Sequence, residues 1–203
     1  MTDAEAEVAQ ARDTGSEEQL VQGLREGDPG AYAQLYNRFT QRVHRFVHWR
    51  LSGDSQTAEE ITVHTLAEAV RCVRSYDARR SSFLSWLLGI ASRQTLAELR
   101  RRQRRKSVPA AVQVPLGSVA EEALASDPTS RLTEQIEAQR QVGRLRAHLS
   151  QLEMEVLVLQ GAYELTAREI GQVLGKSERA ISSLLHRARA KARERLVNDG
   201  QDH

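Results

Sequence analysis

Two clusters of cationic side chains hold the residue types of this chain that are best suited to chemistry. Residues 100–106 read RRRQRRK, which is six cations and no acid. Residues 176–195 contain seven Lys or Arg side chains against two Glu, a net charge of +5. Because such cations neutralise phosphates, two separated clusters predict two contacts with a polyanion. The alternative for either cluster alone is a charged helix end that only faces solvent.

The second cluster follows a helix-turn-helix pattern. TAREIGQVLGKSERAISSLLHRAR predicts a short helix, a tight turn at Gly175 and a second helix with a polar outer face. Such a second helix lies in the major groove of DNA, where its first residues read base edges and later cations hold phosphates. The residues expected to face DNA are Lys176, Ser177, Glu178, Arg179, Ser182, Ser183, His186, Arg187, Arg189 and Arg193. An ordinary helical hairpin with a charged face is the alternative.

Other site chemistry is weakly represented. The sequence has no Gly-rich phosphate loop, no Gly-x-Ser-x-Gly and no nucleophile motif, so we do not expect an enzyme. The single cysteine, Cys72, excludes an internal disulfide and a cysteine-based zinc site. His44 and His48 stand four residues apart, but no carboxylate completes a metal-binding set with them. We therefore expect no metal and no cofactor.

The composition favours helices. Of the 203 residues, 40% are apolar, 28% are charged and only 4% are aromatic. Good helix formers dominate over the β-branched and aromatic residues that strands prefer. No run approaches about 18 apolar residues, so no membrane insertion is predicted, and the acidic N-terminus lacks the apolar core of a signal peptide. These features predict an all-α protein in the cytoplasm.

Capping signals and periodicity place the first cluster at the end of a helical bundle. A short helix is expected from Ser16, where Ser-x-x-Gln forms a capping box, and a second from Asp28-Pro29. Thr57 is expected to cap a third helix, and a polar loop over 75–82 precedes a fourth helix that becomes basic. The apolar stripe of the second helix comprises Tyr32, Leu35, Tyr36, Phe39, Val43, Phe46 and Val47.

The second half begins after a stretch with no amphipathic period. Ser150 and Thr166 are each expected to form a capping box with the Glu three residues later, Gly175 to end a helix in the left-handed conformation, and Ser177 to cap the last helix. This pattern predicts two small helical domains joined by a flexible linker. The expected parts are a disordered arm (1–15), a first domain (16–106), the linker (107–127), a second domain (128–197) and a tail (198–203).

Both halves resemble one known family. LSQLEMEVLVLQGAYELTAREIGQVLGKSERAISSLLHRARAKARERL is similar to region 4 of sigma-70-type factors, especially the extracytoplasmic-function (ECF) group. LVQGLREGDPGAYAQLYNRFTQRVHRFV, TAEEITVHTLAEAVRCVRSYD and SSFLSWLLGIASRQTLAELRRRQRR resemble successive parts of region 2. Two matches in the right order, with the expected linker between them, are more specific than either alone.

The resemblance implies a specificity subunit that binds the clamp and flap of core RNA polymerase and directs initiation at promoter DNA. The helix-turn-helix residues above would read the −35 element. Contacts with the −10 element would come from Tyr76, Asp77, Arg79, Arg80, Ser82, Trp86, Arg93, Gln94, Arg100, Arg101 and Arg104. Core-polymerase contacts would come from Glu59, Glu60, Val63 and His64. An anti-sigma factor is a further implied partner.

The chain departs from the family pattern at several positions. Val63 and His64 stand where a Gln-Glu pair is usual, Ser182 where Lys is common and Leu184 where Arg is common. Two alternative functions therefore stay open. One is a helix-turn-helix regulator that dimerises through its N-terminal bundle and does not bind polymerase. The other is a sigma-like scaffold that has lost polymerase binding.

Overall fold

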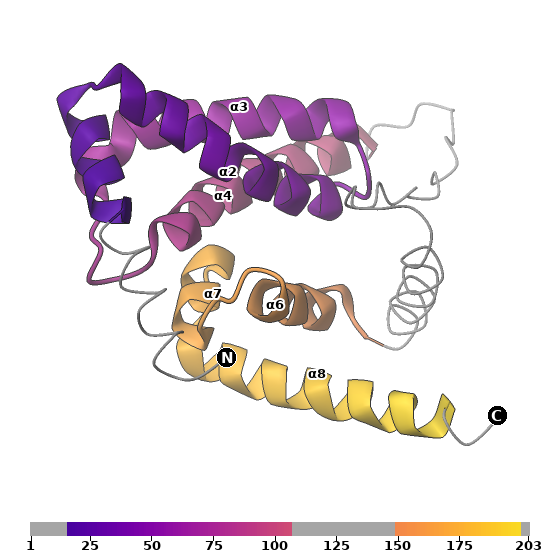
Figure 1. The fold of residues 1–203 in the computed structure, drawn as a ribbon. Helices are drawn as coiled ribbons and strands as arrows, with labels where there is room; N and C mark the ends of the chain where they lie inside the picture. The colour runs from indigo at the N-terminus through magenta and orange to yellow at the C-terminus, as the bar shows by residue number, and fades with distance from the viewer. Residues whose placement is uncertain (1–15, 107–148, 200–203) are drawn as a thin grey trace, which may run out of the picture. The chain divides into compact units, whose positions relative to one another are not determined.

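The chain divides into two compact units. The computed structural model describes residues 16–106 and 149–199, and these belong to the units Met1–Val119 and Ala120–His203 (Figure 1). The described residues form helices and no strand, which confirms the predicted all-α fold class. The expected arm (1–15), the linker (107–127) and the start of the second domain at residue 128 lie outside the described residues.

The first unit is a bundle of helices. After a helical segment at 16–26 come α2 (Pro29–Arg50), α3 (Ser55–Cys72), the 3-10 helix η1 (Val73–Ser75) and α4 (Phe83–Lys106). The three long helices α2, α3 and α4 pack against one another in pairs (Figure 1). The largest fully buried side chains of the first unit are Leu20, Val43, Phe46, Val47, Thr65, Phe83, Leu87 and Leu88.

Local signals decide where α2 begins, and they correct the predicted start of α3. Asp28 caps α2 by accepting hydrogen bonds from two amides of the first turn, and Pro29 follows at the first helical position, as predicted. The prediction that Thr57 caps α3 is wrong. The N-cap is Asp54, whose carboxylate accepts the Thr57 amide at 3.1 Å, because the chain enters the helix directly after a turn at Gly53 with φ +89°.

The apolar stripe of α2 is narrower than predicted. Leu35, Phe39 and Val43 are buried, but Tyr32 is 39% exposed and Tyr36 is 60% exposed. Both tyrosines lie one helical position off the row that faces α3 and α4, so they stay at the edge of the stripe. The core of the unit therefore rests on the aliphatic and phenylalanine residues.

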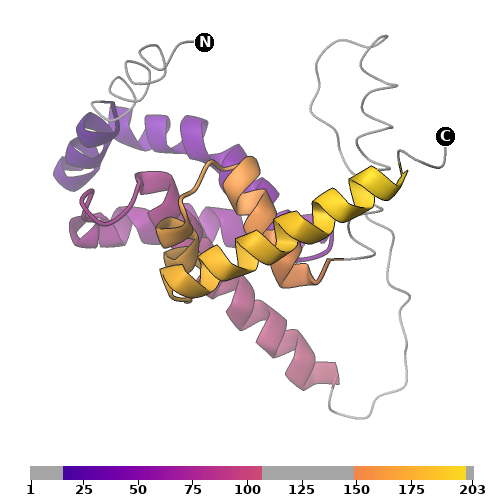
Figure 2. The same cartoon turned by 90° about the horizontal axis from the view of Figure 1, so that it is seen from below.

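The second unit packs α6 (Gln151–Gly161) and α7 (Ala167–Leu174) against one side of the long α8 (Glu178–Asp199) (Figure 2). Both predicted capping boxes are confirmed: Ser150 with Glu153 begins α6, and Thr166 with Glu169 begins α7. The fully buried side chains of this unit are Val156, Leu159, Ile170, Ile181 and Ala188.

The turn between α7 and α8 has the predicted ends. Gly175 adopts φ +65° and ψ +36° at the end of α7. This is the left-handed conformation, which glycine adopts without a steric penalty because it has no Cβ. The Ser177 hydroxyl accepts the amide of Ala180 at 3.3 Å and so caps α8. A second glycine in this motif, Gly171, lies where the turn crosses α7, since a Cβ there would be 2.6 Å from the carbonyl oxygen of Lys176.

Among the described helices, none is both long and apolar enough to span a bilayer.

Candidate nucleic-acid interface

Of the ten residues that the sequence predicts as helix-turn-helix contacts, Lys176 and Ser177 lie in the turn, and the other eight lie on the outward face of α8. Each of them is exposed, from Lys176 in the turn to Arg193 near the end of the helix. The opposite face of α8 buries Ile181, Leu184 and Leu185. Leu184, one of the departures from the family pattern, is 8% exposed and belongs to the core. It is therefore not available to a base.

The described cations of the turn and of α8 fall into two groups. Arg189 donates to the side-chain oxygen of Gln160 at 2.7 Å, and Lys191 donates to the carboxylate of Glu153 at 2.7 Å, so both are held on α6. Four other cations form no ion pair within 16–106 and 149–199: Lys176, Arg179, Arg187 and Arg193. These four are the cations that the outward face offers to a polyanion.

Glu153 takes part in both a capping box and an ion pair with a distant residue of α8. One carboxylate oxygen accepts the amide and hydroxyl of Ser150, each at 2.9 Å, in the capping box. The other accepts Lys191 of α8, although the Glu153 side chain is only 7% exposed. The hydrogen bond from Lys191 and those from Ser150 lower the pKa of Glu153 to about 2. The capping pattern predicts the first contact, but only the tertiary structure reveals the second.

The contact between Glu153 and Lys191 predicts a pH-dependent stability. Because its pKa is lowered in the folded chain, Glu153 stabilises the fold fully above its ordinary value of 4.5, and this contribution is lost as pH falls from there to about 2. At pH 7 we expect Lys191→Met to lose about 1–2 kcal/mol in urea unfolding. That difference from wild type should shrink below pH 4.5. Arg193→Met, which removes an exposed cation of the same helix, is the control and should show no such pH dependence.

The loop at 76–82 before α4 is held from several sides. Arg25 donates to the carbonyl oxygen of Tyr76 at 3.0 Å, and a Glu17 carboxylate oxygen accepts the amide of Phe83 at 2.6 Å. The Ser82 hydroxyl accepts the amide of Ser85 at 3.3 Å at the start of α4. Sequence reasoning missed Glu17 and Arg25 as positioning residues, because they lie more than 50 residues before their partners.

Within this loop, Asp77, Arg79 and Arg80 are exposed, and the Asp77 carboxylate accepts the amide of Arg79 at 3.0 Å. This Asx turn directs the two arginines outward. The loop and the helical segment 16–26 enclose an open depression of about 700 Å³. It is lined by Glu17, Glu18, Val21, Gln22, Arg25, Tyr76, Asp77, Ala78, Arg79, Ser81 and Ser82.

The aromatic residues of this region form a cluster behind the loop. The Phe83 ring lies 5.2 Å from Tyr76, 5.4 Å from Trp86 and 5.4 Å from Phe39, measured between centroids. Tyr76 is 6% exposed and its hydroxyl donates to the carbonyl oxygen of Ser81. This ring is therefore core and shapes the loop from behind, rather than offering a face to a base. Trp86 is half-buried and also packs on Tyr76 at 5.4 Å.

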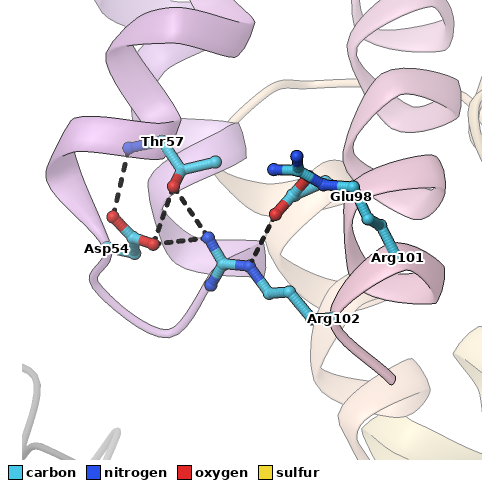
Figure 3. Close-up of polar contacts among 5 residues, drawn as sticks. All are labelled: Asp54, Thr57, Glu98, Arg101 and Arg102. Atoms are coloured by element: carbon cyan, nitrogen blue, oxygen red, sulfur yellow. Dashed lines mark hydrogen bonds and ion pairs between the residues drawn. The ribbon is translucent and has the colours of Figure 1, made fainter. Parts of the chain in front are cut away.

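The basic end of α4 is divided between outward and paired cations. Arg101 and Arg102 both pair with Glu98, and Arg102 also reaches Asp54 at the start of α3 (Figure 3). Within the described ranges, Arg100, Arg104 and Arg105 are exposed and form no ion pair. Earlier in α4, Arg93 is exposed, whereas the Gln94 side chain accepts the hydroxyl of Thr65 at 3.1 Å and lies against α3.

The predicted polymerase contacts share one face of α3. Glu59, Glu60, Val63 and His64 are all exposed. Val63 is 60% exposed, which leaves an apolar side chain in the middle of a polar surface. The other face of α3 buries Ala58, Ile61, Thr62, Thr65, Leu66 and Ala69. In the described part of the chain no three His, Cys, Asp or Glu side chains gather as metal ligands would.

Comparison with known proteins follows the same division into two units. Residues 35–105 match the family Sigma-70 region 2, and residues 139–191 match Sigma-70, region 4. The relatives include the ECF RNA polymerase sigma factor BldN of Streptomyces coelicolor, 25% identical over 89% of this chain, and SigK of Mycobacterium ulcerans, 33% identical over 57%. The chain belongs to the ECF group of the sigma-70 family. It spans 66% of BldN and 64% of SigK, less than two thirds of either.

A solved structure shares the fold of this ECF family member. The sigma factor RpoE of Bartonella quintana, in complex with the anti-sigma factor NepR, matches with a TM-score of 0.57 at 20% identity, over 81% of this chain and 96% of that chain. The first unit carries region 2 and the second carries region 4. The loop at 76–82 and the basic end of α4 thus belong to region 2, and the helix-turn-helix to region 4.

Proposed function

We propose that this chain is a non-enzymatic specificity subunit that binds core RNA polymerase and directs initiation through −10 and −35 elements. The observation that carries the proposal is the pair of cationic surfaces on separate units. One surface lies on the helix-turn-helix of region 4. The other, in region 2, comprises the loop at 76–82, the depression beside it and the basic end of α4. Two modules that each bind one DNA element gain affinity from being linked.

Region 4 would read the −35 duplex through α8. Arg179 lies in the first turn of α8, where a side chain reaches base edges in the major groove. Lys176, Arg187 and Arg193 are exposed cations without ion pairs to other described residues, and they would hold phosphates. Since Arg189 and Lys191 are held on α6, they would contribute less to the DNA than their charge suggests.

Region 2 would hold the strand that opens at the −10 element. An unpaired base outside the stack needs a recess and nearby cations for its phosphates. The depression beside 76–82 supplies the first, and Arg79, Arg80, Arg100 and Arg104 supply the second. Because Tyr76 is core, its part would be to hold the loop in shape.

Partner binding would use the remaining exposed face of region 2. Glu59, Glu60, Val63 and His64 lie together on α3 and would contact the clamp of core polymerase. The exposed Val63 would make this contact partly apolar. An anti-sigma factor is a further proposed partner, since the similar RpoE structure contains one.

Run-off transcription with purified core RNA polymerase of the host bacterium tests the proposal. We expect transcripts from promoters selected by the reconstituted holoenzyme, and we expect the chain to retain core polymerase in a pull-down. A chain that binds DNA alone but neither retains polymerase nor starts transcription would show a regulator instead. Retention of polymerase without any promoter selectivity would show a scaffold.

Arg179 and Arg193 separate base reading from phosphate holding on one helix. They stand 14 residues apart, about 21 Å along the helix axis, which exceeds the width of the major groove. Arg179→Ala should change which −35 sequences are used, at a cost of about 1–3 kcal/mol for the preferred site. Arg193→Ala should weaken all sequences equally and lower the salt slope by about one unit. A promoter library transcribed by both variants measures this, and the reverse assignment would mean that α8 docks in the opposite sense.

A further inference from the structure

Arg102 lies in the basic cluster of α4 but differs from its neighbours in what it contacts. Its Nη2 donates to an Asp54 carboxylate oxygen at 2.5 Å and to the Thr57 hydroxyl at 2.7 Å (Figure 3). Its Nε donates to Glu98 at 2.9 Å. The Arg102 side chain is 34% exposed, and that of Glu98 is 12% exposed. The guanidinium is therefore committed to two carboxylates and a hydroxyl of the protein itself.

One acceptor of Arg102, Asp54, is the N-cap of α3. The same Asp54 carboxylate accepts the amide of Thr57 at 3.1 Å and its hydroxyl at 2.8 Å. Partial burial raises the pKa of Asp54, but the hydrogen bonds from Thr57 and Arg102 outweigh it, so the pKa lies below its ordinary value. Asp54 is thus an anion that binds the first turn of α3 and the last turns of α4 together.

The position of Arg102 on α4 decides where its neighbours point. Residues two apart on an α-helix are about 200° apart around the axis, and residues four apart lie on one face. Arg100 and Arg104 therefore share the face opposite Arg102. When Arg102 is held against α3, Arg100 and Arg104 must point away from it, and both are exposed.

The end of α4 lies beyond the buried core of the first unit. The last buried residue of the helix is Thr95, and the segment from 100 onward is almost entirely cationic. Like charges three and four residues apart repel one another and favour fraying of the final turns. A contact from α4 to another helix opposes that fraying.

We propose that Arg102 is a positioning residue, which latches the basic end of α4 to the N-cap of α3 and thereby aims Arg100 and Arg104 at DNA. The aim at DNA rests on the proposed function, whereas the latch does not. By sequence, the six cations of this cluster are equivalent. In the structure, acceptors of the protein itself engage Arg102, so Arg102 is not one of the cations expected to hold phosphates. The latch also joins the DNA-facing helix to α3, which carries the proposed polymerase contacts.

Hydrogen exchange of the free full-length chain tests the latch. In Arg102→Ala, amides at 55–58 and 98–105 should exchange about three- to tenfold faster than in wild type, because a hydrogen-bonded charged pair is lost. Asp54→Asn keeps an oxygen that caps the helix but removes the charge, so it should have a similar effect, and the double variant should be no worse than either single variant. Arg102→Lys should restore part of the protection, since it keeps the charge but not the forked geometry.

Arg104→Ala is the matched control, because it removes a cation of the same cluster that has no ion pair among the described residues. Its exchange should match wild type, and its promoter affinity in the holoenzyme should lose about 0.7–0.9 of a unit of salt slope. If Arg102→Ala lowered the salt slope as Arg104→Ala does, with exchange at 55–58 unchanged, Arg102 would be a phosphate contact and the latch would be refuted. Unchanged exchange and unchanged affinity would refute it too. Failure of the wild-type chain to support transcription would instead overturn the proposed function. Hydrogen exchange would still test the latch in that case.

Discussion

Replacing Gly171 by alanine is expected to destabilise the second unit by about 2–3 kcal/mol and to displace its helix-turn-helix, because the new Cβ overpacks a backbone contact. That Cβ would lie 2.6 Å from the carbonyl oxygen of Lys176 and 3.5 Å from the amide nitrogen of Glu178. Both atoms belong to backbone, which cannot rotate away as a side chain could. The turn already rests on this residue, since the amide of Lys176 donates to the carbonyl oxygen of Gly171 at 2.8 Å.

Thermal unfolding followed by far-UV circular dichroism, together with hydrogen exchange in α6 to α8, measures this effect. Both tryptophans, Trp49 and Trp86, lie in the first unit, so unfolding followed by tryptophan fluorescence should stay the same. Binding to a −35 duplex should fall with the stability of the second unit.

Two other glycines separate the clash from general glycine effects. Gly161→Ala is the matched control, because nothing lies within 4 Å of its added Cβ, and we expect a change within about 0.5 kcal/mol. Gly175→Ala also meets no atom within 4 Å but forces a left-handed residue, so it should cost about 1–2 kcal/mol. Equal melting curves for the Gly171 and Gly161 variants would contradict the close approach of the turn to α7.

The largest expected effect in the first unit is that of Phe83→Ala, a loss of about 3–5 kcal/mol. Phe83 is fully buried, and its ring contacts the rings of Phe39, Tyr76 and Trp86. Its amide also donates to Glu17, so this one residue joins α2, the loop at 76–82, α4 and the segment at 16–26. Removal of the ring leaves a cavity at the point where the loop ends and α4 begins.

Urea unfolding followed by tryptophan fluorescence reports this loss directly, because Trp86 lies in the cluster. We also expect the −10 selectivity of the holoenzyme to weaken before its −35 selectivity does. Leu96→Ala is the matched control on the same helix, since Leu96 is 40% exposed and should lose less than about 1 kcal/mol. A Phe83→Ala variant as stable as the Leu96→Ala variant would show that the cluster does not hold the loop.

Much of the fold follows from short-range signals in the sequence. The capping boxes at Ser150 and Thr166, the Asp28-Pro29 start and the left-handed Gly175 are confirmed, because each depends on atoms within four residues along the chain. The helix-turn-helix resemblance likewise leads to an exposed surface on the turn and α8 that carries every predicted contact residue. Which of these residues touch DNA stays a prediction.

What only the tertiary structure decided depends on partners far away in sequence. The local pattern predicts Thr57 as the cap of α3, whereas Asp54 caps this helix and is also held by Arg102, 48 residues later. Lys191 and Arg102 look like any other cation in their clusters until Glu153 and Asp54 come within hydrogen-bonding distance. Tyr76 lies in a polar loop by sequence, yet it is buried because Phe83 and Trp86 pack on it.

The sequence alone determined most ends of the described helices and the two basic clusters, since local hydrogen bonds and charge counts are encoded within a few residues. The tertiary structure decided which cations stay exposed without ion pairs and which aromatic rings form the core. It also decided which glycine packs against the backbone of the turn. These outcomes depend on the packing of one helix against another, and side chains such as Lys191 and Gly171 acquire their roles only when that packing brings Glu153 and the turn beside them.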